Sequence, residues 1–185
     1  MVKVCYFGIY SGVNSDEQRT QGVIDGLKAH DIEAVKCTEL FPEVSIQLNG
    51  RASFFAHHIL IALKLLKSYS KLIYFFFPKS CQCKYVIVGF PFIYDAIIAY
   101  FLCQLTRKEL VVDYLMSMYE TTVIDRGQLS PKSFTAKKLF LLDYLTTHLA
   151  DKLIVDTKAH ANYFSKVFNV ELNKFMVVPV GASDK

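Results

Sequence analysis

Leu110-Val111-Val112-Asp113-Tyr114 is the stretch that decides the fold, because it opens a pattern that repeats to the end of the chain. A polar, aromatic and charged loop follows it as far as Gly127, and a long helical pattern begins at Phe134. A strand over residues 152–156, a further helix and a last strand over residues 175–178 complete the pattern. Strands that alternate with helices in this way are typical of parallel α/β sheets.

The first half of the chain shows the same alternation. Strands are predicted over residues 2–10 and 32–37 with a helix between them, and again over 85–89 with a helix over 94–105. A right-handed crossover makes such strands parallel neighbours. We therefore predict one α/β domain over residues 1–185, a Rossmann-like parallel sheet of about six strands with helices on both faces.

One apolar run has two interpretations. Residues 72–77, Leu-Ile-Tyr-Phe-Phe-Phe, extend the helix that precedes them or form a buried strand, and periodicity does not distinguish the two. Pro78 is expected to end this element in either case.

The charge distribution is uneven. The net charge is +4, but no Asp or Glu occurs between Val44 and Tyr94. Six basic residues lie in that span: Arg51, Lys64, Lys67, Lys71, Lys79 and Lys84. One interpretation is attraction of residues 44–94 to an anionic membrane surface or a lipid phosphate. The other is a solvated basic face that keeps an apolar helix soluble. The excess is too small and too local for a nucleic-acid surface, and no nucleic-acid partner is expected.

The sequence also bears on location. It has no secretory signal pattern, and Gly89, Pro91 and Asp95 interrupt the apolar run over residues 85–103, which favours strand, turn and helix over a membrane span. Five cysteines form no disulfide framework, and Cys81-x-Cys83 lacks the further ligands of a zinc site. We expect a cytoplasmic protein without a metal site. Under the membrane interpretation of residues 44–94, it would be peripheral on the inner membrane face.

Common cofactor motifs are absent. Gly8 and Gly12 fail the G-x-G-x-x-G spacing of a dinucleotide site, and the chain has no phosphate-binding G-x-x-x-x-G-K-[ST] or nucleophile G-x-S-x-G. No cofactor is expected to bind this domain alone.

Several segments, in their order and spacing, resemble the N-terminal domain of family 4 glycosyltransferases. These segments are 85–91 (Tyr-Val-Ile-Val-Gly-Phe-Pro), 117–121 (Ser-Met-Tyr-Glu-Thr), 150–157 (Ala-Asp-Lys-Leu-Ile-Val-Asp-Thr) and 177–181 (Val-Val-Pro-Val-Gly). The resemblance covers the chain except about residues 38–84. It implies one half of the two-domain GT-B architecture, in which this domain mostly holds the acceptor and the following domain holds the sugar nucleotide.

The resemblance implies a hexosyltransferase when the enzyme is complete. It would transfer a sugar from a nucleotide-sugar to a glycan or lipid-linked acceptor, in surface polysaccharide or glycoconjugate synthesis. The donor-binding domain is expected to lie outside residues 1–185, in the same gene or a separate chain, so this chain alone is expected to be inactive. Two alternatives stay open: a non-catalytic partner subunit of a split glycosyltransferase, and an unrelated α/β domain that binds a small ligand.

Candidate site residues lie where the predicted strands end, because ligands of open parallel sheets bind outside the carboxyl ends of the strands. Carboxylates that could take the proton of an acceptor hydroxyl are Asp113, Glu120 and Asp125. Candidates for substrate contact are Gly12, Asn14, Arg19, Pro91, Asp95, Tyr119, Arg126, Thr157 and His160. Arg19 and Arg126 suit a phosphate, and Gly12 would let backbone N–H groups approach a ligand.

Each candidate also has a purely structural interpretation. Asp113 could satisfy donors at a strand end, Thr157 could only cap a helix, and Asp125 could pair with Arg126. Many family members carry a His just after the fourth strand, but no His lies near Leu115. The identity of the general base therefore stays open.

Overall fold

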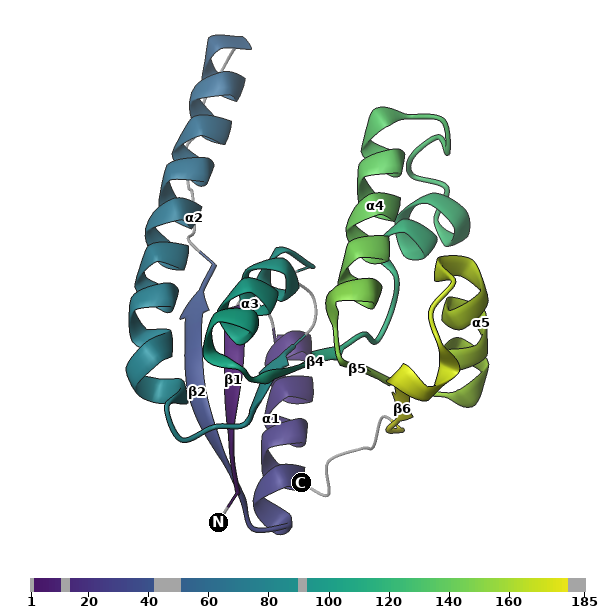
Figure 1. Ribbon diagram of the computed structural model, residues 1–185. Helices are drawn as coiled ribbons and strands as arrows, with labels where there is room; N and C mark the ends of the chain where they lie inside the picture. The colour runs from purple at the N-terminus through teal and green to yellow at the C-terminus, as the bar shows by residue number, and fades with distance from the viewer. Residues whose placement is uncertain (1, 11–13, 42–50, 90–92, 180–185) are drawn as a thin grey trace.

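The computed structural model describes residues 2–10, 14–41, 51–89 and 93–179, with the side chains of all of these except 14–18, 51–58 and 93. It forms a central sheet with helices packed on it (Figure 1).

Six strands form one parallel sheet in the order β2-β1-β3-β4-β5-β6. The strands are β1 (Val2–Tyr10), β2 (Ile32–Leu40), β3 (Tyr85–Val88), β4 (Glu109–Asp113), β5 (Lys152–Val155) and β6 (Phe175–Val177). β1 lies between β2 and β3, so the chain starts inside the sheet, steps to one edge and then crosses back to fill the other side. The predicted Rossmann-like sheet is confirmed.

Five helices connect the strands: α1 (Asn14–Ala29), α2 (Arg51–Ser80), α3 (Ile93–Thr106), α4 (Phe134–Leu149) and α5 (Lys158–Phe168). Local signals set some of their ends. The Ser133 hydroxyl accepts the Ala136 N–H at 3.1 Å and caps α4. Asn169, with φ of 52°, takes the left-handed conformation that ends α5.

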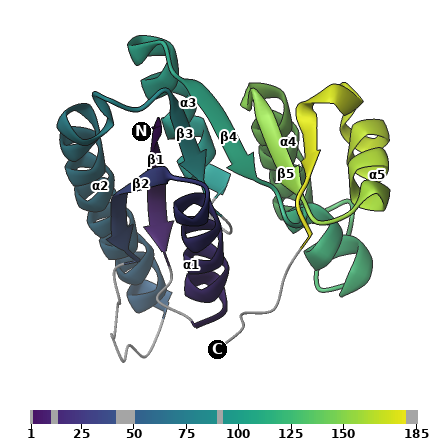
Figure 2. The same cartoon turned by 90° about the horizontal axis from the view of Figure 1, so that it is seen from below.

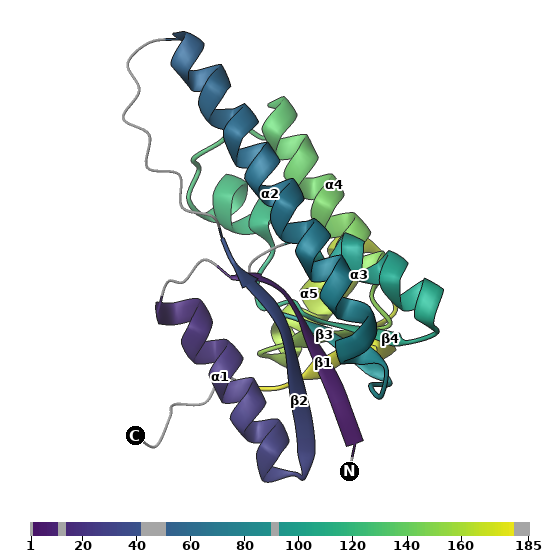
Figure 3. The ribbon, with the colours of Figure 1, turned by 90° about the vertical axis from the view of Figure 1, so that its left-hand side faces the viewer.

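Helices cover both faces of the sheet, as predicted. α1 packs on one face, where Ile24 meets Val4, Tyr6 and Ile87. The larger core lies on the other face, where α2, α3 and α5 cover the sheet (Figures 2 and 3). Right-handed crossovers explain the division, because only the β1-to-β2 connection runs in the opposite direction along the sheet.

Residues 72–77 belong to α2, and the prediction that Pro78 ends the element is wrong by two residues. Leu72 and Phe76, four positions apart, are both buried against the sheet, so the helical period places them together. Pro78 lies in the last turn of the helix, where its missing N–H leaves only the Tyr74 carbonyl without its helical donor. No helix among the described residues is long and apolar enough to cross a membrane.

The loop expected after β4 contains one wide helical turn, η1 (Glu120–Asp125). The Arg126 N–H bonds to the Thr121 carbonyl at 3.1 Å, five residues back, which is the spacing of a π-helical turn. This turn carries two of the three predicted carboxylates.

Candidate functional site

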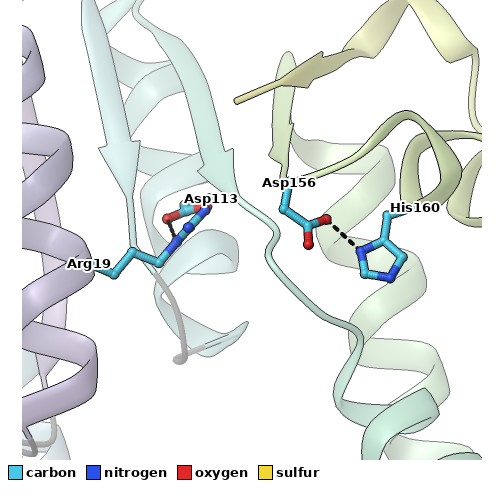
Figure 4. A network of polar contacts seen from close by, with 4 residues as sticks. All are labelled: Arg19, Asp113, Asp156 and His160. Carbon is cyan, nitrogen blue, oxygen red and sulfur yellow. Dashed lines mark hydrogen bonds and ion pairs between the residues drawn. The ribbon is translucent and has the colours of Figure 1, made fainter. Parts of the chain in front are cut away.

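β4 and β5 end side by side, and an aspartate lies at the end of each. Asp113 is the last residue of β4, and Asp156 directly follows β5. Arg19 on α1 reaches Asp113, with Nε at 2.6 Å from Oδ2 and Nη2 at 2.5 Å from Oδ1. His160 on α5 reaches Asp156, with Nδ1 at 2.6 Å from Oδ1. Figure 4 shows the four side chains in a row along this edge of the sheet.

The Arg19–Asp113 pair is largely enclosed, with 15% of the Arg19 side chain and 1% of the Asp113 side chain exposed. Burial lowers the pKa of Arg19, but the hydrogen bond and charge of Asp113 outweigh it and leave the pKa raised, with a smaller contribution from the charge of Asp156. Both oxygens of Asp113 are bound to the guanidinium. Asp113 therefore holds Arg19 in place and is poorly placed to take a proton from a ligand.

The Asp156–His160 pair differs because it reaches solvent, with 44% of the His160 side chain exposed. An ionised carboxylate has no proton to donate, so the shared hydrogen lies on Nδ1 of His160. Neutral His160 then keeps its lone pair on Nε2. Thr157 caps α5 by accepting the His160 N–H at 3.1 Å, which fixes the backbone below the ring.

Glu120 on η1 lies beside this pair. Burial raises the pKa of Glu120, while a hydrogen bond from Tyr163 and the charge of His160 lower it. Tyr163 lies on α5, three residues after His160, so the two residues that lower the pKa of Glu120 come from the same helix, while the charges of Asp125 and Asp143 raise it. The predicted residues Glu120 and His160 are thus brought together.

Asp143 organises this part of the edge and was not among the predicted residues. It is fully buried on α4 and accepts hydrogen bonds from the Ser117 hydroxyl at 2.6 Å and the Tyr119 N–H at 2.8 Å. The Ser117 oxygen in turn accepts the Glu120 N–H at 3.0 Å. Burial raises the pKa of Asp143, and these hydrogen bonds oppose the rise. The signal in the sequence was a lone acid inside the apolar run 139–145, Leu-Phe-Leu-Leu-Asp-Tyr-Leu.

Asp95 was predicted to contact substrate, and its burial corrects this prediction. It is 1% exposed, and its oxygens accept the Ile9 N–H and the Tyr69 hydroxyl, each at 2.8 Å. A side chain at Gly8 would come within 2.6 Å of Oδ2, which explains a glycine with φ of 149° inside β1. Asp95 therefore ties β1 to α2 and α3 from beneath the edge and presents no surface to a ligand.

The remaining candidates fall into two groups. Asp125 and Arg126 are exposed at the end of η1, and the half-buried Tyr119 packs its ring on Phe140 with centroids 5.3 Å apart. Gly12 and Pro91 lie outside the described residues, as does the side chain of Asn14, the first residue of α1.

The edge can therefore offer an oriented imidazole, a half-buried carboxylate and a neutralised guanidinium. Such groups can accept a proton and hold hydroxyl groups. Among the described residues, no three His, Cys, Asp or Glu side chains come together as a metal site would require.

The fold is similar to that of a protein whose structure was solved with a sugar nucleotide bound. Over 98% of its length, the chain superposes on Anabaena Alr3699/HepE, solved in complex with UDP-glucose, with a TM-score of 0.57 and 14% identity. The chain spans 44% of HepE. At this identity the match shows the fold alone: a Rossmann-like α/β sheet that is consistent with one GT-B domain.

Two further comparisons found nothing. No family model and no curated protein matches the chain.

Proposed function

We propose that this chain is the acceptor-side domain of a glycosyltransferase that uses a nucleotide-sugar. The observation that carries the proposal is the Asp156–His160 pair, which lies at the carboxyl edge of a sheet like that of HepE. Ligands of such sheets bind at this edge. The exposed imidazole supplies the proton acceptor that an acceptor hydroxyl requires.

In the proposed reaction, Nε2 of His160 receives the proton of the acceptor hydroxyl. The hydroxyl oxygen then forms a bond to the anomeric carbon of the donor sugar, and the bond from that carbon to the nucleoside diphosphate breaks. The diphosphate leaves with the bonding electrons, and Asp156 stabilises the imidazolium that forms. In this proposal Glu120 and Tyr163, which interact with each other beside His160, hydrogen-bond other hydroxyls of the acceptor.

A second domain completes the site in this proposal. HepE extends well beyond the matched part, since this chain covers 44% of it. We propose that the nucleotide-sugar is held by a donor-binding domain, supplied by the same gene or by a separate chain. Glycans and lipid-linked glycans are the proposed acceptors.

A transfer assay tests the proposal. The chain, joined to or mixed with its donor-binding domain, is incubated with radiolabelled nucleoside-diphosphate sugars, UDP-glucose first, and with a lipid and glycan extract. We expect label to move from one donor into the extract, and no transfer by residues 1–185 alone. Absence of transfer from every donor by the complete protein would overturn the proposal in favour of a small-ligand binding domain.

A further inference from the structure

The helices α2, α3, α4 and α5, which follow β2 along the chain, present no negative charge. They contain two acidic residues, Asp95 and Asp143, and both are buried. Seven Lys or Arg residues lie on α2 and α4: Arg51, Lys64, Lys67, Lys71, Lys79, Lys137 and Lys138. By contrast, α1 on the opposite face of the sheet carries Asp16, Glu17 and Asp25 within 16 residues. Soluble surfaces usually mix positive and negative charges, so the lack of exposed negative charge on these four helices needs an explanation.

α2 also exposes an apolar stripe. Ile59, Leu63, Leu66, Ile73 and Phe77 recur at intervals of four, three or seven residues, so they lie along one side of the helix. Leu63 is 57% and Leu66 is 64% exposed. The core-facing residues of α2 are others, chiefly Leu72 and Phe76. The stripe therefore has no covering element among the described residues.

Lysines border this stripe on the side away from the sheet. At 100° per residue, Lys64, Lys67 and Lys71 lie next to the stripe, and the core-facing residues lie on its other side. Lys71 also pairs with Glu39 on β2 at 2.7 Å. A helix with an apolar stripe flanked by lysines suits a bilayer interface, where the apolar side chains enter the acyl region and the ammonium groups stay at the phosphates.

Two other helices also expose apolar side chains. α3 exposes Phe101 and Leu105, four residues apart, and α4 exposes Leu141 and Phe134. In Figure 1, α3 lies between α2 and α4. Exposed apolar side chains therefore occur on three helices and not on α2 alone.

From this charge and apolar pattern, we propose that α2, with α3 and α4, docks this protein on an anionic lipid bilayer. A second copy of the chain fits less well. A two-fold interface through this layer would set lysines against lysines, with no exposed acid on these helices to neutralise them. The proposal is independent of the sugar chemistry above, because vesicle binding needs neither donor nor acceptor.

Vesicle flotation tests the proposal, with equimolar phosphatidylcholine and phosphatidylglycerol compared with phosphatidylcholine alone. We expect the protein to float with the anionic vesicles only, and to be released as salt rises to about 0.5 M, where charges are screened within a few ångströms. Leu66→Glu and Lys67→Glu are each expected to lower the floated fraction by at least about fivefold.

Two matched variants are the controls. Leu172→Glu makes the same substitution at a 51% exposed leucine on η2 (Leu172–Lys174), and Lys28→Glu reverses a charge on α1. Both are expected to float like wild type, and circular dichroism checks that all four variants are folded. Equal flotation on neutral vesicles, or wild-type flotation of folded Leu66→Glu, would overturn the proposal. So would a dimer that Leu66→Glu dissociates in the absence of any vesicle binding, since that result identifies a protein interface.

Discussion

Titration of the buried Asp95 should make the stability of the fold depend on pH. Burial raises its pKa from the ordinary value of 3.8 to about 7, although the Ile9 N–H and the Tyr69 hydroxyl both favour the charged form. Between these pH values the folded protein keeps the proton and the unfolded chain loses it. The contribution of Asp95 to the free energy of unfolding is therefore fully present below about pH 4 and is lost as the pH rises to about 7.

Asp95→Asn should remove this dependence. The amide reproduces the neutral carboxyl group: its oxygen can accept the Ile9 N–H and its NH₂ can donate to Tyr69. Wild type is expected to lose roughly 1–3 kcal/mol of unfolding free energy between about pH 5 and pH 8, and the variant much less. Urea unfolding at both pH values measures this. A variant with the wild-type slope against pH would show that Asp95 is not the titrating group.

Arg19 and Asp113 form an ion pair whose loss should lower the free energy of unfolding. Arg19→Met leaves the Asp113 carboxylate enclosed without its partner, which is expected to cost about 3 kcal/mol. Lys28→Met removes an exposed charge from the same helix and should change stability by less than about 0.5 kcal/mol. Chemical denaturation compares the two, and equal effects would contradict the pairing.

At the scale of elements, the placement of η1 depends on a residue from another helix. Asp143 on α4 holds the segment that leads from β4 into η1, through Ser117 and the Tyr119 N–H. Glu120 is then fixed through the Ser117 oxygen. The chain thus uses one buried carboxylate to set the position of a proposed ligand-contacting residue.

Asp143→Ala should loosen this element. It leaves the Ser117 hydroxyl and the Tyr119 N–H without their acceptor, at an expected cost of roughly 2–4 kcal/mol. Amide hydrogen exchange should rise over residues 117–125 more than in the strands. Ser130→Ala, on an exposed position of the following loop, is the control. Unchanged protection over 117–125 in the Asp143 variant would contradict this role.

The elements themselves were largely predictable. Alternating apolar runs and helical periods indicated six strands, and the topology rule put Asp113, Glu120 and His160 at one edge. Which side chains pair with each other was not predictable. Arg19 and Asp113, for example, lie 94 positions apart and meet only through the packing of α1 on the sheet. Asp95 illustrates the limit: its position after a strand predicted an exposed ligand contact, yet its direction into the core depends on Gly8 and Tyr69.

At the scale of the whole molecule, the two proposals use different sides of the fold. The edge with Asp156 and His160 is the proposed place of sugar transfer, and the helices α2, α3 and α4, whose two acidic residues are buried, are the proposed contact with lipid. A lipid-linked acceptor would suit both, because docking through α2 would keep the protein at the surface where such an acceptor resides. Vesicle binding and transfer can nevertheless be measured separately.

The turnover number of His160→Gln in the complete enzyme tests the central claim most directly. We expect kcat to fall by at least about a hundredfold, since the substitution removes the proton acceptor, while the melting temperature stays within a few degrees of wild type. His148→Gln on α4, whose ring lies on Tyr144 with centroids 4.0 Å apart, should keep wild-type turnover. Wild-type turnover in a folded His160→Gln enzyme would contradict the assignment of the reaction to this edge of the sheet.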